Sequence, residues 1–163
     1  MKLIPTGIEN FKTMIDKSAY YVDKTNLIID VLNEQVVFCT RPRRFGKTLN
    51  MSMLYYFFSI KEKKNSYLFN HLNISKNKEA LKHQNKYPTI FISLKDMTKS
   101  SYEKQMNRFK EVICLCAKNF LELLNSDILL DSEKKLFQKY VDNEIQDNEL
   151  ESALFNISYF LYK

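Results

Sequence analysis

VVFCTRPRRFGKTLN, residues 36–50, is the stretch of sequence on which the predicted fold depends. An apolar, β-rich run leads into a basic loop, and a helix is predicted to follow from about Lys47 to Ile60. The eight loop positions begin at Arg41 and end in Gly46-Lys47-Thr48, as the phosphate-binding pattern G-x-x-x-x-G-K-[ST] requires. That pattern has glycine at its first position, where this chain has Arg41.

The residue types at the end of this loop suit a nucleotide phosphate. Gly46 can bring the backbone close to a phosphate because it has no Cβ. The N–H groups from Phe45 to Thr48 would then face the anion at the positive end of the helix dipole. Lys47 would bind the β- and γ-phosphates, and the Thr48 hydroxyl would coordinate Mg²⁺. The loop therefore predicts a site for ATP and Mg²⁺, with the binding residues Arg43, Arg44, Phe45, Gly46, Lys47 and Thr48.

Two other interpretations of the same loop stay open. Pro42 lacks an N–H group that would otherwise contact phosphate, so the loop is also compatible with a solvated basic turn. Phe38 and Phe45 flank a set of cations, a combination that suits nucleic acid. These cations are Arg41, Arg43, Arg44 and Lys47. The net charge of +6 favours an acidic partner of either kind.

The composition is that of a folded protein rather than a disordered chain. Of its 163 residues 45% are hydrophobic and 13% aromatic, enough for one domain with a core. Cys39, Cys114 and Cys116 are odd in number and lie in apolar stretches, so no disulfide framework is expected. We find no secretory signal at the N-terminus, and no apolar run approaches the roughly 18 residues of a membrane span. We therefore expect a cytoplasmic protein without a membrane partner.

The rest of the sequence predicts a second strand and further helices. YPTIFISL, residues 87–94, carries the second β signal. Helices are predicted over residues 25–33, 102–124, 131–142 and 148–162, and the polar residues 61–87 are expected to form a surface connection with short helical pieces. This order predicts an α/β, P-loop NTPase-like layered fold with a parallel sheet, incomplete at the C-terminus. Its parts would be a lead-in and first helix (1–35), the strand, loop and helix (36–60), and the second strand with the remaining helices (87–163).

Three separated motifs, and the opening of the chain, resemble one family. YVDKT (21–25), TRPRRFGKTL (40–49) and YPTIFISL (87–94) look like the motifs of bacterial AAA-ATPase-like proteins of the mobile-element or defence type, and IPTGIENF (4–11) resembles the start of that family. An arginine at the first loop position is the rule in this family, so Arg41 agrees with it. The resemblance implies a P-loop ATPase domain, commonly followed by a PD-(D/E)XK nuclease-like domain.

An acid for ATP hydrolysis is not apparent in this sequence. Such an acid ends a second core strand and holds Mg²⁺, and in the family it lies in an apolar strand ending in Asp-Glu-Tyr-Asp. Asp96 follows Lys95 and has no Glu after it, and Asp131 is expected to cap a helix. We therefore assign no catalytic residue. We expect the N-terminal part of a longer or truncated ATPase that does not hydrolyse ATP on its own, with a non-functional remnant as the alternative.

Other residues carry weaker signals. Cys114-x-Cys116 lacks zinc-ligand spacing, and Cys116 is expected in the core. His71 and His83 are expected at the surface. Asp23 and Lys24 of the YVDKT motif either position the nucleotide or shape the turn, and the sequence leaves both open. An oligomer is compatible with all of these interpretations.

Overall fold

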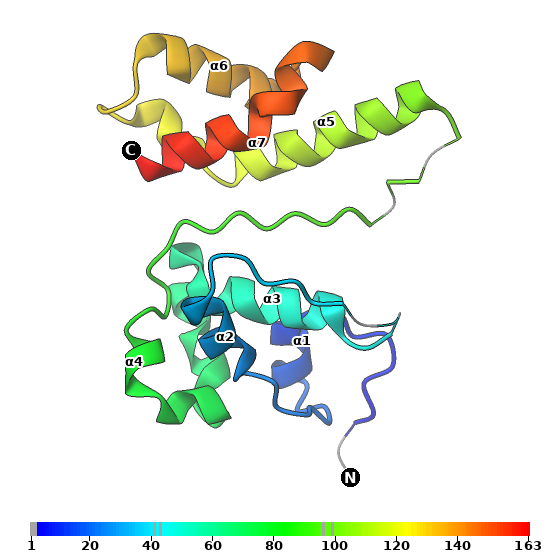
Figure 1. The fold of residues 1–163 in the computed structure, drawn as a ribbon, viewed down its shortest axis with the longest axis vertical. Coiled ribbons are helices and arrows are strands. Elements are labelled where there is room, and N and C mark those ends of the chain that lie inside the picture. Colours follow the sequence, from blue (N-terminus) through cyan, green and yellow to red (C-terminus); the bar gives the residue numbers. More distant parts are fainter. Residues whose placement is uncertain (1–2, 41, 43, 96, 99) are drawn as a thin grey trace. The chain divides into compact units, whose positions relative to one another are not determined.

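The computed structural model describes all residues except 1, 2, 41, 43, 96 and 99, and it divides into two compact units. Unit 1 spans Met1–Thr89 and unit 2 spans Ile90–Lys163. Unit 1 contains α1 (Phe11–Asp16), α2 (Leu27–Asn33), α3 (Lys47–Phe58), the 3₁₀ segments η1 (Ile60–Phe69) and η2 (Asn73–Lys76), and α4 (Lys78–Leu81). Unit 2 contains α5 (Tyr102–Lys118), η3 (Leu121–Asn125), α6 (Asp131–Asp142) and α7 (Asp147–Tyr162) (Figure 1).

The core of unit 1 forms around one face of α3. Met53 and Phe57 lie four residues apart, so both project from the same face, and both are fully buried. Phe69 of η1 contacts Phe57 edge to face, with ring centroids 5.1 Å apart, and stacks on Phe11 of α1 at 5.2 Å. The sequence prediction that the apolar stripe of this helix is core packing is therefore confirmed. The polar stretch 61–87 contributes more to this core than expected, because Leu68, Phe69, Ile74 and Ala80 are all buried.

Unit 2 is a set of packed helices with its own core. Phe137 and Tyr140 of α6 are fully buried, as are Ala153 and Ile157 of α7. At the starts of α6 and α7, a glutamate side chain of the first turn accepts a hydrogen bond from the backbone N–H of the N-cap residue. Leu130 N–H donates to Glu133 at 2.9 Å, and Gln146 N–H donates to Glu149 at 3.1 Å. The Glu149 carboxylate also pairs with Lys139 at 2.7 Å, which ties α7 to α6.

The predicted parallel sheet is wrong. Among the residues that the structure describes there is no strand, and the one β-type contact is an isolated parallel bridge between Ser59 and Tyr87. Residues 36–40 are extended, but no described residue forms a backbone hydrogen bond with them. The exposed fractions of Val36 and Phe38 are 73% and 88%, so this run is not buried between two layers. The α/β layered class is therefore replaced by a helical one.

Tyr87, the first residue of the second predicted strand, pairs with the chain at the end of α3 and not with another strand. Tyr87 N–H donates to Phe58 O at 3.0 Å, and Tyr87 O accepts from Ile60 N–H at 2.8 Å. The buried Asn85 side chain donates to the carbonyls of Tyr56 and Ser59. Residues 85–87 therefore cap the carboxyl end of α3 instead of entering a sheet. β-propensity alone did not decide the fold, because a strand needs a neighbour with which to exchange hydrogen bonds.

Most predicted helices are confirmed, with shifted ends. The helix expected from Lys47 is α3, the helix over 131–142 is α6, and the helix over 148–162 is α7, which begins at Asp147. The long helix over 102–124 is interrupted after Lys118 and resumes as η3. Asp131 is the first residue of α6 and not its cap, which is Leu130. The lead-in contains an unexpected helix, α1, whose N-cap Asn10 accepts from Thr13 N–H at 3.0 Å. The assignment of residues 1–163 to part of one P-loop domain stays a prediction.

Candidate nucleotide site

The basic loop leads into the start of α3, as the sequence predicted, but the segment before it, residues 36–40, is not the predicted strand. Residues 36–40 run alongside α3 in the opposite direction, and the chain reverses between them (Figure 1). Arg44 and Gly46 both adopt left-handed backbone conformations, with φ of 68° and 75°. Left-handed φ strains any residue with a Cβ, so glycine is the residue suited to this turn. Arg41 and Arg43 lie outside the described residues.

The amino end of α3 has the features of an anion site. Gly46 is the N-cap and offers no side chain to the first-turn N–H groups, and the first turn contains no acidic residue. The first intrahelical bond is from Asn50 N–H to Gly46 O at 2.9 Å. The N–H groups that precede it point out of the helix end, where the helix dipole is positive. Lys47 and Thr48 occupy this turn and are exposed, as are Arg44 and Phe45.

A cavity of about 840 Å³ lies beside this helix end, between α2, α3 and the extended segment; we refer to it as the α2–α3 cavity. Its apolar lining is Leu27, Val31, Val37, Phe38, Phe45, Met51 and Leu54. Its polar and charged lining is Lys24, Asp30, Glu34, Gln35, Lys47 and Asn50, joined by Cys39 and Thr40. The volume is in the range of small-molecule sites, and the mixture of apolar walls with a few charged groups is typical of them. Of the predicted site residues, Phe45 and Lys47 line the cavity.

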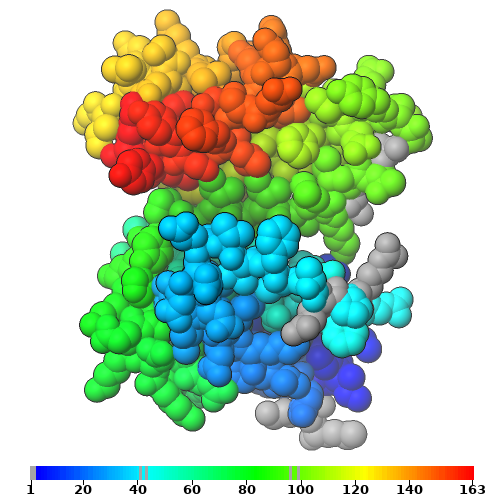
Figure 2. Space-filling model, in the orientation of Figure 1, coloured from blue at the N-terminus to red at the C-terminus, as the bar shows by residue number. Residues whose placement is uncertain are grey.

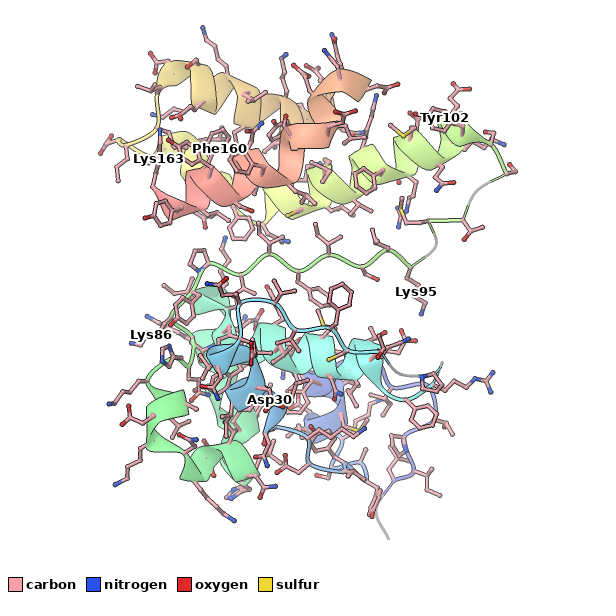
Figure 3. All side chains as sticks on the ribbon, viewed as in Figure 1. Asp30, Lys86, Lys95, Tyr102, Phe160 and Lys163 are labelled. Atoms are coloured by element: carbon pink, nitrogen blue, oxygen red, sulfur yellow. The ribbon has the colours of Figure 1, made fainter. Side chains whose placement is uncertain are left out.

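Two segments that line the cavity can be located in the figures. The segment that ends at residue 40 is drawn in light blue and lies at the surface of unit 1 in the face shown in Figure 2. Asp30 of α2 is labelled in Figure 3. Asp30 and Glu34 were not predicted as site residues: Asp30 lies in α2, and Glu34 is the extended residue that ends it. No sequence pattern indicated them.

The YVDKT motif forms a set of hydrogen bonds with η2. One oxygen of the Asp23 carboxylate accepts from the Thr25 N–H at 2.9 Å and from the Thr25 hydroxyl at 2.7 Å. The other oxygen accepts from Asn73 N–H at 2.6 Å, and Thr25 Oγ1 accepts from Ile74 N–H at 3.1 Å. Partial burial alone would raise the pKa of Asp23, but the bonds from Thr25 and Asn73 outweigh it and lower the pKa. Asp23 and Thr25 therefore shape the turn before α2 and hold it to η2.

The other candidate residues do not form a site. Cys116 lies in the core of unit 2, where burial raises the pKa of its thiol to about 11, and the Cys114 thiol donates to Val141 O at 3.2 Å. His83 stacks on Tyr87. In the described parts of the chain no three His, Cys, Asp or Glu side chains come together as metal ligands. Asp96 lies outside those parts. None of the helices described is both long and apolar enough to cross a membrane.

Comparison with known proteins assigns the chain to a family. A family model described as AAA-ATPase-like, "Predicted AAA-ATPase", matches residues 5–156, which is nearly the whole chain. The chain therefore belongs to the AAA-ATPase-like family. This confirms the resemblance seen in its motifs. No curated protein and no solved structure matched the chain.

Proposed function

We propose that this protein binds ATP together with Mg²⁺, through the loop of residues 41–48 and the first turn of α3. The observation that carries the proposal is the geometry around Gly46. Its left-handed backbone turns the chain into the amino end of α3 and leaves that end without a capping side chain. A phosphate accepting from the N–H groups of this turn would satisfy them and interact favourably with the helix dipole. Membership of a family of predicted ATPases supports the same conclusion.

Each residue of the loop has a proposed part. Lys47 gives a point charge to the β- and γ-phosphates, and Thr48 gives a hydroxyl ligand to Mg²⁺. Arg44 is exposed at the turn and adds positive charge. Arg43 is assigned the same part from its position in the loop sequence. The Phe45 and Gly46 N–H groups complete the phosphate contacts. The α2–α3 cavity adjoins the loop and offers room for the nucleoside. No residue is assigned to hydrolysis.

The test compares ATP binding by the wild-type protein with binding by Lys47→Ala and Lys86→Ala, measured by calorimetry in the presence of Mg²⁺. Lys86 is the matched control. It is an exposed lysine of unit 1 beside Tyr87, which pairs with the carboxyl end of α3, whereas Lys47 lies at the amino end (Figure 3). We expect Lys47→Ala to weaken binding about ten- to hundredfold, the range for a lost hydrogen bond to a charged group, and Lys86→Ala to have no effect. Equal affinities for all three proteins would exclude this site.

A second candidate function is binding of single-stranded nucleic acid. The observation in its favour is that Phe38 and Phe45 have exposed fractions of 88% and 58% and lie near the exposed cations Arg44 and Lys47. Exposed aromatic rings stack on bases, and neighbouring cations contact phosphates. The affinity for a labelled oligonucleotide should then weaken steeply between about 50 and 200 mM salt. Phe38→Ala should reduce the binding free energy by about 1–3 kcal/mol, the contribution of one stacked base. No binding at low salt would exclude this function.

A further inference from the structure

Lys24 lines the same cavity as Lys47 of the candidate phosphate loop, although the two are 23 positions apart in the sequence. Both lysines line the α2–α3 cavity, and among its described lining residues they are the two cations. The sequence left the role of Lys24 undecided between nucleotide contact and turn formation. The structure separates these roles, because Lys24 takes part in the turn through its backbone alone and its side chain is left for another role.

The backbone of Lys24 is fixed on both sides. Its N–H donates to the Tyr21 hydroxyl at 3.3 Å, and its C=O accepts from Leu27 N–H at 3.1 Å, at the start of α2. Asp23 and Thr25, the two neighbours of Lys24, are held to η2 by the bonds to Asn73 and Ile74. Thr25 is fully buried, whereas Lys24 is exposed at the cavity. Because this backbone is already held, contact with a ligand orders the Lys24 side chain but requires no further ordering of the backbone.

Three charged residues among the described lining of the cavity, Lys24, Asp30 and Glu34, are not paired with one another. In the part of the chain that the structure describes, Lys24, Asp30 and Glu34 form no ion pair with each other, and their charged groups have no hydrogen-bond partner. An ammonium group is a donor that needs an anion, and carboxylates need donors. A nucleoside polyphosphate offers both kinds of partner, since its phosphates are anionic and its ribose and base carry O–H and N–H donors.

We propose that Lys24 is a second phosphate-binding residue of the nucleotide site, with Asp23 and Thr25 as the positioning residues that hold it at the α2–α3 cavity. This inference rests on the proposed function, since it assigns a residue to the same site. Lys24 contacts the phosphates beyond the first one. The YVDKT motif then serves the nucleotide through Lys24 alone, and the rest of the motif serves the fold.

The experiment measures dissociation constants for ATP and for AMP, each with Mg²⁺, in the wild type and in Lys24→Gln, Lys24→Arg, Lys47→Ala and Lys86→Gln. We expect Lys24→Gln to weaken ATP binding about tenfold or more and AMP binding much less, because AMP lacks the phosphates that Lys24 contacts. Lys24→Arg keeps the charge and should recover most of the ATP affinity. Structural damage would weaken both nucleotides equally, and that result would overturn the proposal.

The positioning role is tested by a double-mutant cycle. Asp23→Asn replaces one carboxylate oxygen by an NH₂ group. The amide side chain then keeps one acceptor oxygen, so it cannot accept both from Thr25 and from Asn73 N–H. We expect Asp23→Asn to weaken ATP binding in the wild-type background and to have little further effect in the Lys24→Gln background. Additive losses in the two backgrounds would show that Asp23 does not act through Lys24. Thermal unfolding of each variant identifies those that fail to fold, and the Lys24 variants, which alter no buried contact, keep the test decisive.

The outcomes separate this inference from the proposed function. ATP binding that is lost in Lys47→Ala but unchanged in Lys24→Gln would overturn the inference and leave the proposed function standing. A wild-type protein that binds no ATP would overturn both.

Discussion

At the scale of single residues, Gly46 determines the geometry of the candidate site. The sequence identified it from the loop pattern, and the structure gives the physical reason, a backbone φ of 75° at the amino end of α3. The roles of Asp23 and Lys24 could not be separated from the sequence, because both are charged and adjacent. Only the position of Asn73, fifty residues later in the chain, shows that Asp23 bonds to the fold.

Gly46→Ala is expected to lower the free energy of unfolding by about 1–2 kcal/mol and also to weaken ATP binding. A Cβ at Gly46 meets no atom within 4 Å, so the cost comes from the left-handed backbone rather than from a clash. Gly7 is the matched control, since its φ is also 75° and its surroundings are equally open. Gly7→Ala should cost similar stability in urea denaturation but leave ATP affinity unchanged. An equal loss of affinity in both variants would mean that Gly46 has no specific role in the site.

At the scale of elements, α3 is held at its carboxyl end and along one side. Residues 85–87 cap its carboxyl end, and the buried Ser52 hydroxyl joins it to α1. The helical periodicity of the sequence was sufficient to predict α3, since its apolar stripe is what the core buries. The extended segment 36–40 was predicted as a strand from residue type alone. Its conformation is extended, but the missing hydrogen-bond partners cannot be read from the residues of the segment itself.

Ser52→Ala is expected to destabilise unit 1 by about 1–3 kcal/mol. Ser52 Oγ accepts from Phe11 N–H at 2.8 Å in a buried position and donates to Leu49 O at 2.9 Å. Its removal leaves the Phe11 N–H without a partner at the start of α1, and an unsatisfied buried donor carries its full desolvation cost. Ser66→Ala, at an exposed position of unit 1, is the control and should change the unfolding free energy by less than about 0.5 kcal/mol in the same denaturation measurement. Equal effects of the two substitutions would contradict this account of the α1–α3 contact.

At the scale of the whole molecule, the chain forms two units, each with its own core. All residues that line the candidate site belong to unit 1. Mutation of the core of unit 2 should therefore disturb unit 2 and not the site. Phe57 of α3 and Phe137 of α6 allow a matched comparison, because both are fully buried phenylalanines in different cores.

Phe137→Ala is expected to speed hydrogen–deuterium exchange in peptides of residues 90–163 and to leave peptides of α3 unchanged, whereas Phe57→Ala should do the reverse. Each substitution removes a large buried ring, at a cost of about 3–5 kcal/mol to the core that contains it. Mass spectrometry of the exchanged peptides reports each unit separately. Faster exchange in both units after either substitution would show that the two cores unfold together.

The sequence predicted local features better than long-range ones. The helices α3, α6 and α7 and the loop at Gly46 follow from periodicity and from short motifs, so they were found. The sheet was wrong because two β-rich runs, 36–40 and 87–94, were assumed to pair, while Tyr87 instead pairs with the end of α3. The cavity residues Asp30 and Glu34 were missed because their importance depends on where α2 packs, which no local pattern specifies.

The most direct test of the central claim is a titration of ¹⁵N-labelled protein with Mg-ATP, followed by the backbone amide resonances. If the amino end of α3 binds phosphate, the largest shifts will be those of Phe45, Gly46, Lys47 and Thr48, with smaller shifts at Lys24 and along the cavity face of α2. The amides of α6 and α7 will not move. Shifts that concentrate away from residues 44–49, or no shift at saturating nucleotide, would contradict the claim that this loop is a nucleotide site.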